Sequence, residues 1–215
     1  MFNRTAGIVL IFALVAGLGL WLAQKSLGPD SAGGRQAGSV QFYPTPRELP
    51  DFSLSQPDGT RLIPGELRGH WTLVFLGYTS CPDVCPTTLA ELAQAQKQWE
   101  SIPESLRPRV LFVSVDPQRD TLPRLGEYAH AFHKDTLAAT ADEPALERFA
   151  AALGLVFMKS PGRDFAKNPN DYSMDHSASI AVLDPDVRLA GIMRPPFNPQ
   201  VIARDFTTLT RTATP

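Results

Sequence analysis

The only two cysteines of the chain, Cys81 and Cys85, lie four positions apart, and each is followed by a proline. A thiolate is the form of cysteine that attacks disulfides and binds metal ions. Because a residue before proline is disfavoured in helical geometry, we expect both cysteines on a loop that leads into a helix. The positive end of that helix would favour the thiolate. The spacing therefore predicts a redox pair or a metal site.

Two less specific interpretations of the pair are a structural disulfide and two buried cysteines that act as small apolar residues. A disulfide that closes about five residues would remove only about 2 kcal/mol of unfolded-state entropy, against about 4.7 kcal/mol for a hundred-residue loop. The flanking prolines and Asp83 argue against deep burial. Reactive or metal-binding thiols are thus the favoured interpretation.

A metal ion held by two sulfurs needs a further donor, and the chain has four histidines. His176 stands where a long polar loop enters a predicted strand, and in a thioredoxin-like arrangement that point faces the cysteine loop. The alternative for His176 is a loop histidine hydrogen-bonded to Asp175. For His130 and His133, three apart on a predicted helix, a solvated helix face is favoured. His70 is expected at the surface, so His176 is the preferred third donor.

Two thiolates and one imidazole suit soft or borderline metal ions. Cu(I) accepts three-coordinate sulfur and nitrogen ligation, and Cu(II) would add water or another oxygen. A closed zinc site would need a fourth protein ligand, for which the sequence offers no candidate. The donor set Cys81, Cys85 and His176 therefore predicts a copper site, occupied by Cu(I) or Cu(II).

The segments that must position these residues alternate between strands and helices. The apolar run 71–78 predicts a buried central strand before the cysteines, and Pro86 predicts a helix that extends to about residue 100. The other expected elements are a strand–turn–strand over 50–63, a buried strand over 109–115, helices over 121–133 and 143–153, a short strand over 155–158, a polar loop over 160–175, strands over 178–183 and 187–193, and a helix over 198–211. This order predicts an α/β, thioredoxin-like fold.

An uninterrupted apolar run occupies residues 6–23, with Arg4 before it and Lys25 after it. Its length is near the lower limit for a helix that spans a bilayer. A cleaved signal peptide is the alternative, but the bulky Trp21 would then occupy a position that favours a small residue. We therefore expect an N-terminal transmembrane helix that stays attached.

The chain then divides into three expected parts, namely a membrane anchor over 1–25, a flexible tether over 26–48 and a thioredoxin-like domain over 49–215. The tether is rich in Gly, Ser, Gln and Pro. We expect a single-pass protein of the inner (cytoplasmic) membrane with its soluble domain on the periplasmic side, where two cysteines can form a redox pair. The net charge of −2 gives no indication of nucleic-acid binding.

Three blocks of the sequence have a specific resemblance. They are residues 77–89 (GYTSCPDVCPTTL), 113–121 (VSVDPQRDT) and 175–177 (DHS). In this order they resemble the Sco/SenC family, which are copper proteins of cytochrome c oxidase assembly. The resemblance implies copper ligands at Cys81, Cys85 and His176, and delivery of copper to the binuclear centre of oxidase subunit II. The family often has His where this chain has Ser80, which argues against an auxiliary ligand there.

Three functions are compatible with these features. The favoured one is a copper chaperone, a binding protein rather than an enzyme, which receives its metal from another copper chaperone. The alternative is a membrane-anchored thiol-disulfide reductase that acts on the oxidase cysteines. A peroxiredoxin-like peroxidase fits poorly because a proline follows Cys81. Asp116, Arg119 and Asp120 are expected either to form a patch that faces a partner or to cap the helix that begins near Thr121.

Overall fold

The computed structural model describes residues 14–15, 17–19, 21 and 36–212. The chain separates into two compact units, Met1–Gly34 and Arg35–Pro215. In the first unit the described residues are helical, and most of the expected membrane anchor lies outside them, as do residues 26–35 of the expected tether. None of the helices in the described part of the chain combines the length and apolar character that a bilayer crossing requires.

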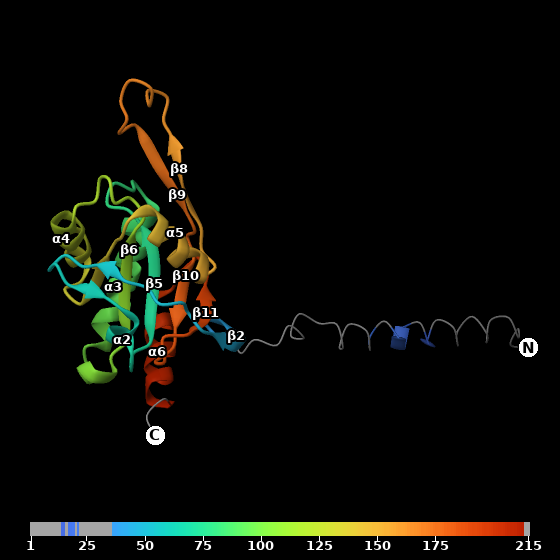
Figure 1. Ribbon diagram of the computed structural model, residues 1–215. Coiled ribbons are helices and arrows are strands. Elements are labelled where there is room, and N and C mark those ends of the chain that lie inside the picture. The colour runs from blue at the N-terminus through green and yellow to red at the C-terminus, as the bar shows by residue number, and fades with distance from the viewer. Residues whose placement is uncertain (1–13, 16, 20, 22–35, 213–215) are drawn as a thin grey trace, which may run out of the picture. The chain divides into compact units, whose positions relative to one another are not determined.

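The second unit is built around a mixed sheet of seven strands in the order β1-β2-β11-β10-β5-β6-β7 (Figure 1). β5, β6 and β7 pair in parallel, and all other neighbours are antiparallel. All six residues of β5 are buried, as expected for a central strand covered on both faces. The strands are β1 (Gln36–Ala37), β2 (Val40–Arg47), β5 (Thr72–Gly77), β6 (Arg109–Ser114), β7 (Thr136–Ala139), β10 (Ile180–Leu183) and β11 (Leu189–Met193).

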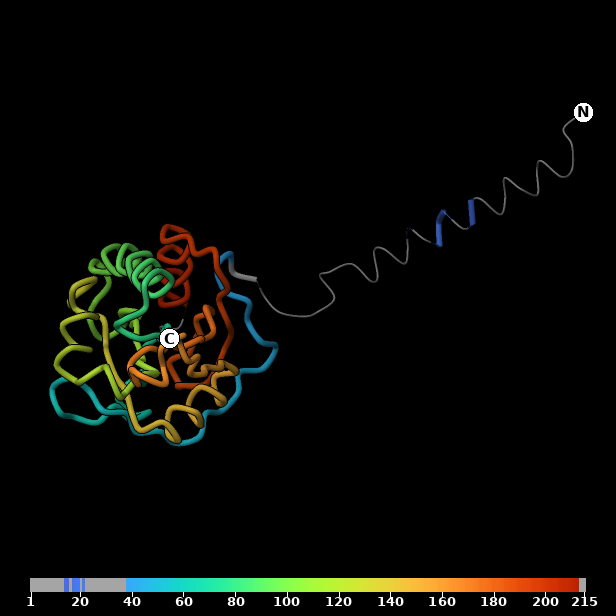
Figure 2. The backbone as a smooth tube through the Cα atoms, turned by 90° about the horizontal axis from the view of Figure 1, so that it is seen from above, coloured from blue at the N-terminus to red at the C-terminus, as the bar shows by residue number. Residues whose placement is uncertain are grey.

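Helices cover both faces of this sheet. Helix α3 packs against α6 on one face, and α5 lies on the other (Figure 2). Trp99 is fully buried between α3 and α6, where its indole N–H donates to the carbonyl oxygen of Ala203 at 3.1 Å. Helix α4 packs against β7 and α3. The helices are α2 (Pro64–Leu67), α3 (Val84–Trp99), α4 (Leu122–Phe132), α5 (Glu143–Ala152) and α6 (Pro199–Thr212), with a short 3-10 helix at Glu104–Leu106.

Two small antiparallel sheets complete the domain. β3 (Leu54–Ser55) pairs with β4 (Arg61–Leu62), as the predicted strand–turn–strand requires. β8 (Phe157–Pro161) pairs with β9 (Tyr172–His176). This second pair forms a hairpin that projects beyond one end of the large sheet (Figure 1).

Two sequence predictions differ from this structure, and strand β7 was not predicted. The expected polar loop over 160–175 contains most of β9 and the end of β8. Gly162, Pro169 and the asparagines lie in the turn between the two strands, whereas Pro161 is the last residue of β8. The folded part also begins before residue 49, since β2 pairs with β11 and buries Val40. Pro44 and Pro46 are typical of linkers, so the sequence predicted a tether where β2 lies. They lack backbone N–H groups, and the pairing with β11 is irregular in this region.

Candidate metal centre

The two cysteines lie at the junction between β5 and α3. Cys81 is half-buried in the loop after β5, whereas Cys85 is completely buried in the first turn of α3. The expectation of two cysteines on a shallow loop was therefore wrong for Cys85. Pro86 is tolerated there because the first amides of a helix have no intrahelical acceptor. The amide of Cys85 instead donates to Cys81 Sγ at 3.4 Å.

Gly77 leaves the space that the buried thiol occupies. A Cβ atom at this position would lie 2.8 Å from Cys85 Sγ and 2.7 Å from a ring carbon of Phe112. Both distances are shorter than real Cβ contacts permit. The last residue of β5 must therefore be glycine if Cys85 is to reach its observed position.

His176 ends β9 and points its ring at the cysteines. Its Nδ1–H donates to the carbonyl oxygen of Ser177 at 3.1 Å, which leaves the Nε2 lone pair directed at Cys85 Sγ, 3.3 Å away. The rings of Phe75 and Tyr78 contact the imidazole edge-on. Asp175 accepts instead from the hydroxyl of Ser160, so the alternative hydrogen bond between His176 and Asp175 is not present.

The sulfur atoms of Cys81 and Cys85 and one ring nitrogen of His176 all lie within 4.8 Å of one another. Typical metal–sulfur and metal–nitrogen bonds of about 2.3 and 2.0 Å would separate three planar donors by roughly 3.7–4.0 Å. Small side-chain adjustments therefore suffice to place all three on one ion. Among the described residues, no other group of three His, Cys, Asp or Glu side chains meets this criterion.

Burial shapes the protonation of these donors. It raises the pKa of the Cys85 thiol, with a smaller contribution from the neighbouring Cys81. It also lowers the pKa of His176, so the imidazole stays neutral and its nitrogen is free to bind a metal ion. A cation is what would stabilise the deprotonated Cys85, and its binding would release the thiol proton.

Asp120 holds the cysteine loop in place. Its carboxylate accepts from the backbone N–H of Thr79 at 2.9 Å, from the Thr79 hydroxyl at 2.6 Å and from Ser114 Oγ at 2.6 Å. The exposed Arg124 adds bonds to the hydroxyls of Thr79 and Ser80. The sequence suggested that Asp120 forms a partner-facing patch or caps the helix near Thr121. It is only 1% exposed, which excludes an exposed patch, and its carboxylate accepts from Thr79 and Ser114 rather than from amides of α4.

Asp116 and Arg119 hold the histidine side of the site. The Asp116 carboxylate accepts from Arg119 Nε at 2.5 Å and from the Tyr172 hydroxyl at 2.7 Å. Burial and this hydrogen bond raise the pKa of Tyr172 to about 12, so the phenol remains a donor. Asp116 is also 1% exposed. The second sequence block thus supplies the loop, residues 116–120, that braces both halves of the site.

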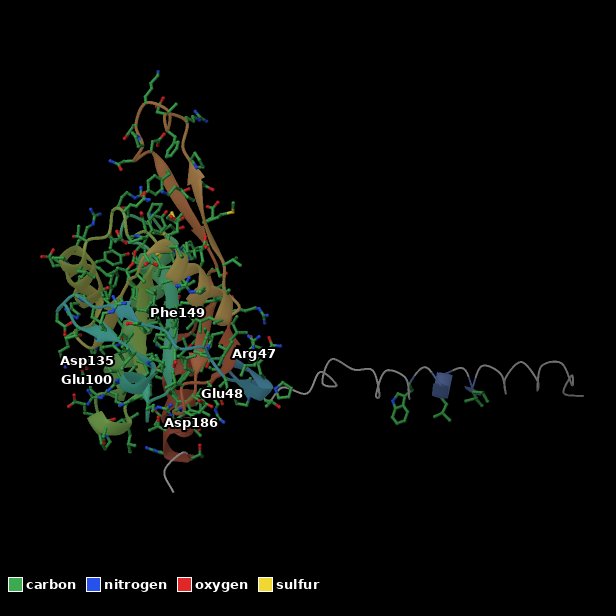
Figure 3. The ribbon with its side chains drawn as sticks, in the orientation of Figure 1. Arg47, Glu48, Glu100, Asp135, Phe149 and Asp186 are labelled. Carbon is green, nitrogen blue, oxygen red and sulfur yellow. The ribbon has the colours of Figure 1, made fainter. Side chains whose placement is uncertain are left out.

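The other histidines do not take part. His70 is buried, against expectation, and its Nδ1–H donates to the carbonyl oxygen of Arg107 at 2.9 Å. His133 is also buried and contacts Glu100 at 3.6 Å, so it does not share a solvated face with the exposed His130. Glu100 lies at the end of the domain away from the β8–β9 hairpin (Figure 3).

Solved structures with similar folds include one Sco protein with copper bound and one in the apo form. ScoI of Bradyrhizobium japonicum, with copper bound, is 29% identical, covers 74% of this chain and 98% of its own, and has a TM-score of 0.66. The apo Sco1 protein of Thermus thermophilus is 31% identical, covers 83% of this chain and 99% of its own, and has a TM-score of 0.66. These likenesses confirm the predicted α/β, thioredoxin-like fold.

Sequence comparison gives the same result. The mitochondrial SCO2 homolog of Bos taurus is 32% identical over 180 residues, which are 83% of this chain and 65% of the bovine protein. The family model described as SCO1/SenC matches residues 42–211, which include the three sequence blocks and almost all of the described domain. The chain belongs to the SCO1/SenC family.

Proposed function

We propose that this chain binds one copper ion through Cys81, Cys85 and His176 and delivers it to the binuclear copper centre of cytochrome c oxidase subunit II. The observation that carries the proposal is the convergence of two sulfurs and one unprotonated ring nitrogen within 4.8 Å. This donor set favours copper over hard ions. Relatives with the same fold are described with copper bound.

The exposure of the donors supports transfer rather than permanent storage. Cys85 and its sulfur are buried, whereas Cys81 is half-buried on the loop between β5 and α3. An incoming thiolate from a partner can therefore approach the ion from the Cys81 side while Cys85 still holds it. The same side would accept copper from a donor chaperone. The oxidase as recipient rests on membership of the family.

A copper titration of the reduced full chain, with X-ray absorption to identify the ligands, tests the proposal. We expect about one copper per chain with two sulfurs and one imidazole nitrogen in the first coordination shell. His176→Ala should lose the nitrogen signal and keep both sulfurs, while His130→Ala, at an exposed position, should match the wild type. Full copper binding by the oxidised, disulfide-bonded form would refute the thiolate site.

We further propose that residues 1–25 anchor the chain in the inner membrane with the domain on the periplasmic side. The support is the apolar run 6–23 between Arg4 and Lys25. Fractionation followed by protease treatment of spheroplasts tests this arrangement. The domain should sediment with membranes and be cleaved from outside, and a domain protected from the protease would contradict the orientation.

A second candidate function is favoured by the unequal exposure of the two thiols. The thiolate of Cys81 would attack a substrate disulfide and form a mixed disulfide, with release of one substrate thiol. The thiolate of Cys85 would then attack Cys81 Sγ, so that the substrate leaves fully reduced and the Cys81–Cys85 disulfide remains. Cys85→Ser should trap the mixed disulfide between Cys81 and the substrate. If no mixed disulfide forms with the oxidase cysteines as substrate, this role is excluded.

A further inference from the structure

The β8–β9 hairpin carries His176 and extends away from the main sheet (Figure 1). Strand β9 contacts β5, near the imidazole, which packs against Phe75 and Tyr78. The ring of Tyr172, at the other end of β9, is buried against the body of the domain. Whatever holds Tyr172 in place therefore fixes the direction of the strand that delivers His176.

Arg119 holds this part of the strand through several contacts at once. Its Nη1 donates to the carbonyl oxygens of Tyr172 at 2.9 Å and Asn170 at 3.3 Å. Its guanidinium carbon lies 3.7 Å from the centre of the Tyr172 ring. Its Nε donates to Asp116, which also accepts from the Tyr172 hydroxyl. The backbone, ring and hydroxyl of Tyr172 are thus all fixed by one Asp–Arg pair.

Two routes lead from Arg119 to the imidazole. Along β9, Tyr172 and His176 are four positions apart and so lie on the same face of the strand. The second route passes through side-chain contacts. The guanidinium carbon of Arg119 lies 5.6 Å from the centre of the Tyr78 ring, and the centres of the Tyr78 and His176 rings are 6.1 Å apart in an edge-on arrangement. Arg119 itself does not bond to a proposed ligand, so any influence on the metal passes through His176.

We propose that Arg119 is the positioning residue that sets the orientation of His176 as the third copper ligand. This inference rests on the proposed copper site. Without the guanidinium, Tyr172 in β9 and Asn170 in the turn before it lose their hydrogen bonds to Arg119, and the strand that directs the imidazole toward Cys85 is held less firmly. Copper would then be bound by the two thiols. Loss of a residue that orients a metal ligand typically weakens metal binding about 10- to 100-fold, so Arg119→Gln should weaken it by this factor.

Hydrogen exchange of the metal-free full chain tests the mechanical part of the inference. Amides of residues 172–176 should exchange at least several-fold faster in Arg119→Gln than in the wild type, while those of β5 stay unchanged. Arg163→Gln is the matched control, because it removes the same charge from an exposed position in the turn of the same hairpin. Equal protection of β9 in Arg119→Gln and the wild type would overturn the inference.

A double-mutant cycle of copper affinity tests the link to His176. Arg119→Gln should weaken copper binding and lose the nitrogen signal in X-ray absorption, yet it should have no further effect in an His176→Ala background. Arg119→Lys keeps the charge but lacks the planar fork and should be intermediate. Equal losses in both backgrounds, or a retained nitrogen signal, would overturn the inference alone. A wild-type chain without nitrogen ligation would instead overturn the proposed copper site, whatever the exchange data show.

Discussion

Substitution of Gly77 by alanine tests the close approach between β5 and the buried thiol. The added Cβ would lie 2.8 Å from Cys85 Sγ and 2.7 Å from the Phe112 ring. Overpacking of this kind costs about 1–3 kcal/mol, and the lower backbone entropy of alanine in the unfolded chain returns about 0.4–1 kcal/mol. The difference is about 0–2.6 kcal/mol, and since both contacts are below 3.0 Å we expect Gly77→Ala to lower the free energy of unfolding by a value in the upper part of this range, about 1–2.6 kcal/mol.

Thermal unfolding of the metal-free protein measures this effect. For a domain of this size, each kcal/mol shifts Tm by about 2–4 °C. Gly65→Ala is the matched control, because its Cβ would meet nothing within 4 Å and it lies in α2. The control should therefore be neutral or slightly stabilising.

The same substitution should also weaken copper binding. The new methyl group would meet two atoms of the Phe112 ring and Cys85 Sγ, and a shift of the sulfur would move it from its place 3.3 Å from His176 Nε2. Copper affinity should fall in Gly77→Ala and stay unchanged in Gly65→Ala. If Gly77→Ala matched the control in both Tm and copper affinity, the reasoning that glycine is required to accommodate Cys85 would be refuted.

Three further predictions concern stability. Burial lowers the pKa of His70, so the folded state binds fewer protons than the unfolded state. The stability that the neutral imidazole contributes is therefore present above about pH 6.5 and is lost as the pH falls below this value. In urea titrations His70→Gln should lose less stability than the wild type between pH 7 and 5, and the control His130→Gln should behave as the wild type. Asp120→Asn removes a charged acceptor of three hydrogen bonds and should cost about 1–3 kcal/mol in urea unfolding, with weaker copper binding; an unchanged midpoint would contradict its bracing role. Tyr172→Phe keeps the ring but removes the hydrogen bond to the Asp116 carboxylate. It should lower the free energy of unfolding in urea by about 1.5–3 kcal/mol, and an unchanged value would contradict a role for the hydroxyl in holding the strand.

The fold could be predicted where hydrophobic runs are long and bounded by clear signals. The uninterrupted apolar run of β5 and the prolines near the starts of α3, α4, α5 and α6 located the central strand and the helices to within a few residues. The same reasoning failed for β2, because Pro44 and Pro46 are typical of linkers. What makes β2 a strand is its pairing with β11, a contact that no local pattern contains.

The three candidate donor side chains could be predicted from the sequence, but the residues that support them could not. Cys81, Cys85 and His176 have side chains whose chemistry is apparent from residue type, and the structure brings them together. The roles of Asp116, Arg119 and Asp120 were missed, because charged residues after a strand are usually solvated. Their three charges directly after the buried run 109–115 were the available signal. Burial of Cys85 was also missed, since it depends on the absence of a side chain at Gly77.

The contact between Cys85 and His176 joins residues that are 91 positions apart in the chain. An unfolded chain would keep a dithiol but would have no fixed imidazole beside it, so a bound ion would act as a removable cross-link between two distant segments. Such a ligand stabilises the native state by about 4.1 kcal/mol when its free concentration is a thousand times its dissociation constant. Release of a bound ion would therefore lower the stability of the domain and remove the link between the β8–β9 hairpin and the cysteine loop.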